Sequence, residues 1–280
     1  MTKIFYFSAT GNSLWSAKKI AHNISADNPT EKYELVNIGK AAYDGSFAND
    51  DLKISSGKKQ KHLIEADAVI FVFPSFAYGM PRVMRQFVKN AEFKASYVAA
   101  LVTYGSSPGG TLGGLRRILR KKNISKMFFG KIPAVENYLA IFGTPGEETI
   151  KKRSEAQKRV TDDLSRLIIE RKENKVSSFY PLSFFVYCLF TLGIKIFYRF
   201  YQVSDKCAGC GVCEKICPVS AIVMKTKKGA SVKQPRFTSR CEHCQGCVNL
   251  CPLRAIQFAR ARFGSRGYRH PEISINELIK

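Results

Sequence analysis

The chain has 280 residues, 45% of them hydrophobic, which is enough for one large domain or two ordinary ones with a substantial core. Lysine and arginine total 45 against 22 aspartates and glutamates, a formal net charge of +23, which suggests an acidic protein partner, a nucleic acid, an anionic membrane surface or only a well-solvated exterior. Eight of the 9 cysteines fall between Cys207 and Cys251, and this concentration excludes a disulfide scaffold, whose cysteines would be spread along the chain.

The first segment predicts a β-strand rather than a secretion signal. Residues 3–7 (KIFYF) are apolar, and the charged region, apolar run and cleavage site of a signal peptide are not seen around them. We therefore expect a cytoplasmic protein, in which thiols stay reduced and clustered cysteines are best interpreted as metal ligands.

Strand-like and helix-like segments alternate through the first half of the chain. Apolar strands are predicted at 3–7, 33–38, 68–73, 97–103 and 126–132, and helices at about 14–24, 81–92 and 111–122. Strands that are apolar throughout indicate a parallel sheet covered by helices on both faces. In such sheets, ligands bind beyond the carboxyl ends of the strands.

Three loops follow these strand ends. The first, SATGNS at 8–13, offers hydroxyls and backbone N–H groups at a helix N-terminus, which suits a phosphate monoester. It lacks the lysine and the glycine pattern of nucleoside triphosphate and dinucleotide loops. The others, PSFAYGMP at 74–81 and YGSSPGG at 104–110, place aromatic residues beside glycine, as a flat ring requires. A single loop of this kind is often only a helix cap, so the prediction depends on all three.

This set of loops resembles that of the flavodoxins, whose T-G-N-[ST] loop holds the phosphate of FMN. The resemblance implies an α/β fold, a flavodoxin-like doubly wound five-stranded parallel sheet with strand order 2-1-3-4-5. The basic character of this half departs from the acidic surfaces usual in flavodoxins. The residues that the resemblance assigns to FMN are Ser8, Thr10, Gly11, Asn12, Ser13, Ser75, Phe76, Tyr78, Gly79, Tyr104 and Gly105.

A charged helix is predicted from Lys151 to about Glu173. Its polar face is expected to place Gln157, Arg159 and Asp163 in solvent, and its apolar stripe consists of Val160, Leu164, Leu167 and Ile168.

The next segment, 176–202, is the most apolar part of the chain. Residues 176–194 carry no charge, which is at the lower limit for a membrane span, and residues 179–201 are rich in aromatic side chains. A span would separate the two halves, and Pro181, Lys195 and Arg199 weaken it further. We therefore expect a helix that packs between two domains, with a peripheral membrane contact or a partner surface as alternatives.

The last part of the chain contains one cysteine pattern twice. The spacing C-x2-C-x2-C-x3-C, followed by proline, occurs at Cys207, Cys210, Cys213 and Cys217 and again 34 residues later at Cys241, Cys244, Cys247 and Cys251. Zinc sites with four cysteines usually show two pairs separated by a longer gap, so the pattern favours iron–sulfur clusters. Cys188 lies outside the pattern and is predicted to be a buried, inert thiol.

Residues 203–260 closely resemble the bacterial-type two-cluster ferredoxins, a small α+β fold. The resemblance implies two [4Fe-4S] clusters with crossed ligation, so that Cys251 completes the first cluster and Cys217 the second. As a whole, the chain resembles the flavodoxin–ferredoxin fusion proteins of anaerobic bacteria and archaea, including VENY at 135–138 and YRHPEI at 268–273. The predicted parts are a flavodoxin-like domain at 1–173, an aromatic-rich connecting helix at 174–202 and a ferredoxin domain with a basic tail at 203–280.

The combination predicts an electron-transfer protein that relays electrons between FMN, two [4Fe-4S] clusters and a redox partner with an acidic surface. The alternatives are an FMN-dependent reductase of a small molecule, fed by its own clusters, and a redox sensor. No catalytic residue is predicted, because the loops contain no acid–base pair. His243, inside a cysteine loop, is a candidate for tuning a cluster potential. The arginine-rich tail at 259–270 is expected to close over its domain rather than to bind nucleic acid.

Overall fold

The computed structural model of the chain describes residues 1–39, 62–177, 180–226, 232–258 and 266–279. Its first half is a parallel sheet in the order β2-β1-β3-β4-β5, which confirms the predicted flavodoxin-like order. The strands are β1 (Thr2–Tyr6), β2 (Tyr33–Asn37), β3 (His62–Pro74), β4 (Ala91–Tyr104) and β5 (Met127–Pro133).

Strands β3 and β4 begin well before the apolar runs that predicted them, at 62 and 91 rather than 68 and 97. The two added segments pair with each other in register, and in them buried residues such as Ile64 and Phe93 alternate with exposed ones such as Glu65 and Lys94. A search for continuously apolar strands misses this pattern, because alternation marks a strand with one solvated face.

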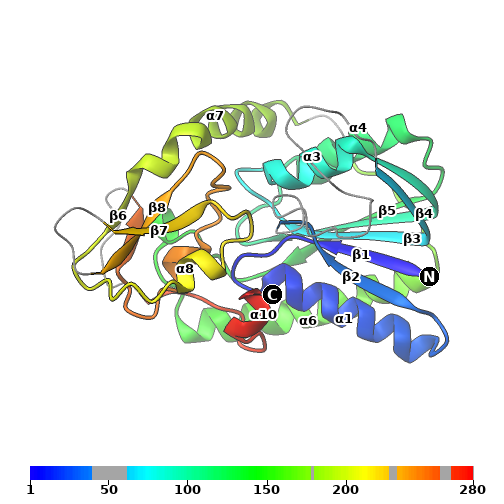
Figure 1. Cartoon of the computed structure of the whole chain (residues 1–280). Coiled ribbons are helices and arrows are strands. Elements are labelled where there is room, and N and C mark those ends of the chain that lie inside the picture. The colour runs from blue at the N-terminus through cyan, green and yellow to red at the C-terminus, as the bar shows by residue number, and fades with distance from the viewer. Residues whose placement is uncertain (40–61, 178–179, 227–231, 259–265, 280) are drawn as a thin grey trace.

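Two helices cover each face of the sheet (Figure 1): α1 (Asn12–Asp27) and α6 (Glu147–Ile169) lie on one side, α3 (Arg82–Asn90) and α4 (Thr111–Leu119) on the other. Successive residues of β1 point to opposite faces, so Ile4 packs with Ile20 of α1 while Phe5 packs with Phe87 of α3. A short 3₁₀ turn, η1 (Arg120–Lys122), extends α4.

Helix α6 corrects the prediction of its buried face. Gln157 was expected in solvent but is fully buried, because its amide donates to the Asn12 carbonyl at 2.9 Å and the Ser16 hydroxyl at 3.0 Å on α1. Leu167, assigned to the apolar stripe, is 36% exposed instead. Arg159 and Asp163 are exposed as predicted. The error arose because α6 packs on α1 through polar groups as well as apolar ones.

The cysteine-rich part forms two small antiparallel ribbons. Strand β6 (Tyr201–Val203) pairs with β9 (Ile256–Phe258), and β7 (Ile222–Thr226) pairs with β8 (Lys233–Phe237). Each cysteine loop leads into a four-residue helix, α8 (Val212–Lys215) or α9 (Gly246–Asn249), and then into β7 or β9. The sequence repeat is therefore also a structural repeat of a small α+β unit.

Helix α7 (Pro181–Phe197) and the 3₁₀ turn η2 (Tyr198–Phe200) join the two halves. The inner side of α7 contacts both of them, because Tyr187 donates to the Met80 carbonyl at 2.7 Å and Phe197 packs 5.4 Å from the His243 ring. The helix lies across the outside of the molecule rather than inside a domain interface (Figure 1), and Cys188 on it is only partly buried. In the described part of the chain, the segment Pro181–Phe200 alone is long and apolar enough to cross a membrane, with mean hydropathy 1.6, and 6% of it is buried.

The C-terminal tail returns to the first half of the molecule, where α10 (Ile275–Ile279) lies beside α1 (Figure 1). The His270 amide donates to the Thr10 carbonyl at 2.8 Å, and the His270 ring stacks on Trp15 with a centroid separation of 5.0 Å. The Tyr268 hydroxyl donates to Asn12 Oδ1 at 2.7 Å. The tail thereby supports the loop between β1 and α1 from behind.

Candidate redox-cofactor site

The loop at 8–13 connects β1 to the N-terminus of α1 and is held from several sides. Asn12 donates to the Val135 carbonyl at 3.0 Å, Ser13 shares a hydrogen bond with the Thr103 hydroxyl at 2.8 Å, and Asn137 donates to the Thr10 hydroxyl at 2.8 Å. Gly11 adopts φ 104°, and a Cβ there would lie 2.9 Å from His270 Cβ, so both conformation and space require glycine. The loop is a rigid cradle whose amides lie at a helix N-terminus, as a phosphate requires.

The loop after β3 makes a tight turn. Phe76 and Gly79 exchange two backbone hydrogen bonds at 2.8 and 2.9 Å, and the residues between them, Ala77 and Tyr78, have φ of 46° and 66°. Two consecutive left-handed residues without glycine are costly, which is typical of a functional site. The turn presents Tyr78, whose ring lies over Gly109 of the neighbouring loop.

These loops surround a cavity of about 310 Å³, within the range of small-molecule sites. Its lining includes polar residues of the 8–13 loop and the aromatic residues Phe76 and Tyr78. Gly11 and Gly79 do not line it; the missing side chains of these glycines leave room for His270 and Tyr187 instead. The predicted flavin residues that line it are Ser8, Thr10, Asn12, Ser13, Ser75, Phe76, Tyr78, Tyr104 and Gly105.

Three further elements complete the cavity. None of their residues was among the predicted flavin-binding residues, although the loop at 133–149 was expected to lie over the flavin. The loop after β5 contributes Glu136 and Tyr138, and the short helix α5 (Leu139–Phe142) follows it. Helix α7 provides Val186 and Phe190, and the second cysteine loop provides His243. The VENY segment and the density of aromatic residues at 179–201 were the available signals for the first two.

His243 connects the cavity to the cysteines. Its Nε2 lies 2.8 Å from the Tyr138 hydroxyl and its Nδ1 lies 3.0 Å from the Tyr201 hydroxyl, while its backbone N–H donates to Cys241 Sγ at 3.4 Å. Burial lowers the pKa of His243 to about 4, so the ring is neutral and one tyrosine donates to it while the other accepts. A residue of the cavity wall is thus hydrogen-bonded to Cys241, one of the predicted cluster ligands.

In the part of the chain that the structure describes, no three of the cysteines are arranged to hold one metal ion, but the charges that act on each thiol link cysteines across the sequence repeat. Burial is the first cause that raises the pKa of the Cys241, Cys244 and Cys247 thiols, and the negative charge of Cys217 is among the further causes for all three. Burial likewise raises the pKa of Cys213 to about 12, and the neighbouring charges of Cys251, Cys210 and Cys207 contribute. The predicted crossed ligation would bring the same cysteines together around each cluster.

The fourth cysteine of each run sits in the same local geometry. Cys217 Sγ accepts the Ala221 N–H at 3.2 Å, and Cys251 Sγ accepts the Ala255 N–H at 3.3 Å. Hydrogen bonds of this kind stabilise a thiolate over a thiol. Thiols with raised pKa values hold their protons at neutral pH, so binding of iron must release those protons. The donor set therefore fits iron–sulfur clusters.

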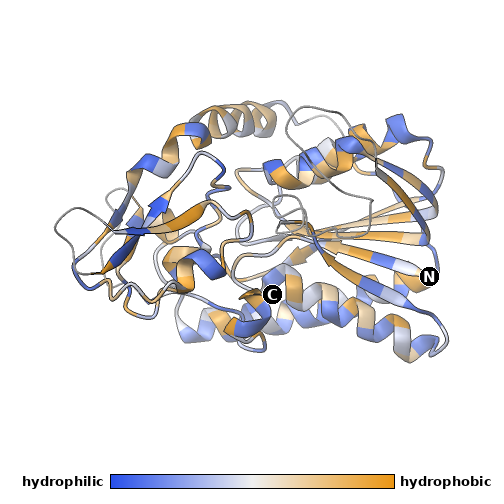
Figure 2. Ribbon diagram, in the orientation of Figure 1, coloured by the Kyte–Doolittle hydropathy of each residue, from blue (hydrophilic) through white to orange (hydrophobic). Residues whose placement is uncertain are grey.

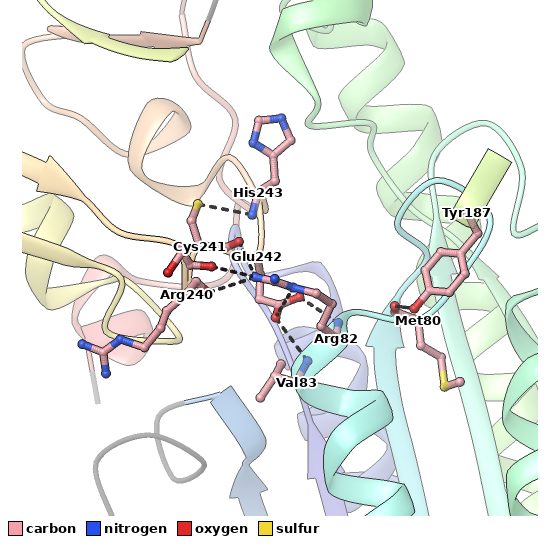
Figure 3. Close-up of polar contacts among 9 residues, drawn as sticks. Met80, Arg82, Val83, Tyr187, Arg240, Cys241, Glu242 and His243 are labelled. Atoms are coloured by element: carbon pink, nitrogen blue, oxygen red, sulfur yellow. Dashed lines mark hydrogen bonds and ion pairs between the residues drawn. The ribbon is translucent and has the colours of Figure 1, made fainter. Parts of the chain in front are cut away.

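Glu242, beside His243, attaches the second cysteine loop to α3 (Figure 3). Its carboxylate is 1% exposed and accepts the backbone N–H groups of Arg82 at 2.8 Å and Val83 at 3.2 Å, at the N-terminus of that helix. Arg82 Nε is 3.4 Å from the carboxylate, and its guanidinium donates to the Cys241 carbonyl at 2.8 Å. Burial raises the pKa of Glu242, while Arg82 and the two amides act in the opposite direction.

The cysteine repeat differs at these contact residues. The positions equivalent to Glu242 and His243 in the first run are Ala208 and Gly209. These residues have no polar side chain and so cannot form the side-chain contacts that Glu242 and His243 form. This asymmetry is visible in the sequence and indicates which cysteine run faces the first half of the molecule.

Residues 206–260 match the protein family described as "4Fe-4S dicluster domain". No curated protein is similar enough to the chain to be matched. Among solved structures, an azoreductase from Bacillus anthracis str. Sterne is 15% identical, covering 58% of this chain and 100% of its own with a TM-score of 0.36. A flavodoxin from the domain Archaea is 15% identical, covering 61% and 99% with a TM-score of 0.34. The two-electron reduced flavodoxin of Megasphaera elsdenii is also 15% identical, covering 57% and 99% with a TM-score of 0.34.

These structures say nothing about the function of the chain, because their TM-scores are low. The strand order β2-β1-β3-β4-β5 is the stronger evidence for the flavodoxin-like fold. A flavodoxin-like five-stranded domain is followed by an iron–sulfur domain with a ferredoxin-like fold. This architecture is consistent with a flavodoxin–ferredoxin fusion, and it places the chain among proteins of redox chemistry.

Proposed function

We propose that the protein is an electron carrier that relays electrons between FMN in the cavity and two [4Fe-4S] clusters, and from these to a redox partner. A flavin exchanges electrons singly or in pairs, whereas a [4Fe-4S] cluster exchanges one at a time. The observation that carries the proposal is the position of His243, which lines the cavity and donates its backbone N–H to Cys241.

The chain's own residues would divide the work as follows. Ser8, Thr10 and Ser13 would hold the phosphate at the N-terminus of α1, and Phe76, Tyr78 and Tyr104 would flank the ring, since all six residues line the cavity. Cys207, Cys210, Cys213 and Cys251 hold the first cluster, and Cys217, Cys241, Cys244 and Cys247 hold the second. Glu242 and Arg82 fix the distance between the second cluster and the cavity.

The first cluster is the better contact point for a partner, because Cys210 is exposed whereas Cys217, Cys241 and Cys247 are buried. Lys206 and Lys215 near it are also exposed. Asp205 beside them is exposed as well. It is therefore the net charge of +23 on the whole chain that favours an acidic partner protein and disfavours partners with the same sign of charge. The proposed location is the cytoplasm, and no role with nucleic acid is proposed.

A second candidate function is reduction of a small molecule at the flavin. It is favoured by the exposed edge of the cavity, where Ile141 is 72% exposed and Phe142 is 55% exposed although both line it. An open apolar edge of this kind can admit a substrate or a partner's cofactor.

Two measurements on anaerobically purified, full-length protein test the proposal. Iron, zinc and flavin analysis should give about eight irons and one FMN per chain, following from two cubane clusters. After flash reduction, flavin–cluster equilibration should proceed at a rate independent of protein concentration. A rate proportional to concentration, or zinc in place of iron, would contradict the relay.

Steady-state turnover separates the two candidate functions. A carrier should exchange electrons rapidly only with a protein partner. Saturable reduction of a small molecule, lost when FMN is removed, would identify a reductase instead.

A further inference from the structure

The outward side of α7 is a continuous apolar stripe. Leu182, Phe185, Leu189, Leu192 and Ile196 recur every three or four residues, which places them on one face of the helix. Their exposed fractions are 75%, 59%, 54%, 66% and 50%. An exposed apolar surface of this extent is unusual in a soluble protein and marks a contact site.

The opposite side of the helix is tied to the protein, which decides how α7 can lie. Tyr187 bonds to Met80, Phe190 lines the cavity, and Ile194 is 1% exposed. A helix that crossed a bilayer would have to give up all of these contacts and separate the two halves. A contact parallel to the surface keeps them and buries only the outer stripe.

The elements next to the stripe carry exposed positive charges. Lys195 and Arg199 follow the stripe at its C-terminal end, and Arg85 and Lys89 are exposed on α3, next to α7 through the Tyr187–Met80 contact. The described residues of α3, α4, η1, α7 and η2 include no aspartate or glutamate. Figure 2 shows the mostly orange, hydrophobic α7 and, next to it, α3 with hydrophilic positions in blue.

We propose that this face, defined as the outer stripe of α7 with its basic surroundings, binds an anionic membrane surface with α7 lying in the headgroup plane. Apolar side chains enter the acyl boundary while lysine and arginine contact lipid phosphates, the combination typical of interfacial helices. A second copy of the chain is a poorer occupant, because like-charged basic residues would face each other across the interface and each chain carries a net charge of +23.

Co-sedimentation of the full-length holoprotein with vesicles tests this proposal. The protein should bind phosphatidylcholine vesicles that contain phosphatidylglycerol, bind phosphatidylcholine alone more weakly, and lose affinity for the anionic vesicles as salt is raised. Leu189→Gln and Leu192→Gln should each lower the partition coefficient about tenfold. Leu167→Gln is the matched control, because it makes the same change at an exposed position of α6, on the opposite side of the sheet.

A second readout does not depend on weakening the helix. Leu192→Trp and Leu167→Trp place a fluorophore on the proposed face and on the control helix, and the single native tryptophan, Trp15, is only 7% exposed. Brominated lipids should quench the added fluorescence in the first variant and leave the second unchanged. Both variants retain an apolar side chain and should fold.

Three results would overturn the proposal. The first is wild-type protein that stays in solution with anionic vesicles at low salt. The second is wild-type binding by the Leu189→Gln/Leu192→Gln variant, or equal quenching at both tryptophan positions. The third is a stable dimer in light scattering that the same substitutions dissociate, which would assign the stripe to a second copy.

Discussion

Replacement of Glu242 by glutamine tests whether one buried carboxylate holds the second cysteine loop against the first half of the molecule. The carboxylate receives two backbone N–H groups of α3 and lies 3.4 Å from Arg82 Nε (Figure 3). Glutamine keeps the shape and one acceptor oxygen. It removes the negative charge. It also replaces one acceptor oxygen by an NH₂ group, which donates and cannot accept the backbone N–H that faces it.

The expected cost follows from this geometry. Removal of one partner from a buried ion pair typically costs about 3–5 kcal/mol. Two features make the cost smaller here. The Arg82 side chain is 27% exposed, so water can solvate its charge when the carboxylate is removed. Burial also raises the pKa of Glu242, which means that the desolvation of the carboxylate already cancels part of the stability that the ion pair provides. We therefore expect Glu242→Gln to reduce the free energy of unfolding by about 2 kcal/mol.

Denaturant unfolding of anaerobic holoprotein, followed by flavin release and cluster absorbance, measures this cost. Glu147→Gln is the control, because Glu147 forms an ion pair with Arg266 while 83% exposed, and such pairs contribute little. Flavin–cluster equilibration should also slow in Glu242→Gln, with unchanged iron content. If the two variants unfold within about 0.5 kcal/mol of each other, Glu242 is not the attachment that the structure indicates.

Three further predictions follow from the site. Cys217→Ala should alter the EPR signal of the Cys241 cluster and leave that of the Cys207 cluster intact; the opposite result would exclude crossed ligation. Burial lowers the pKa of His270 to about 4. Below about pH 6.5 the unfolded chain therefore binds a proton on this histidine that the folded chain does not bind. The free energy of unfolding should fall for this reason by about 2 kcal/mol between pH 7 and pH 5. His270→Phe, which keeps a ring on Trp15, should flatten that part of the pH dependence in melting experiments, and equal slopes would refute the assignment. Ser8→Ala should weaken FMN binding about tenfold in fluorescence titrations, because a hydrogen bond to a charged phosphate is lost.

The fold and the cofactor loops were predictable because they depend on local patterns. Apolar strands separated by helices predicted a parallel sheet, and the resemblance to flavodoxins implied its strand order. The repeated cysteine spacing predicted the second part of the chain. Gln157 shows where local patterns fail. A glutamine among charged residues reads as solvated, and only the packing of α6 on α1 makes its amide a buried donor to Asn12.

The contribution of α7 to the cavity could not be predicted for a related reason. Its sequence is apolar on every side, so periodicity does not distinguish the inner face from the outer one. Phe190 and Leu189 are neighbours with similar chemistry, yet Phe190 lines the cavity and Leu189 is 54% exposed. The difference depends on where the two halves lie, which is a tertiary property.

The cavity is completed by residues from both halves, and this changes what the joining of the two parts means. A flexible linker would only raise the local concentration of one part near the other. Here His243 and α7 form walls of the cavity, and Tyr268 donates to Asn12 in the predicted phosphate loop. The C-terminal part therefore shapes the cavity that we propose for the flavin, in addition to carrying the cysteines. A bound flavin would be in contact with residues of the iron–sulfur part from the moment it binds, without any docking step between domains.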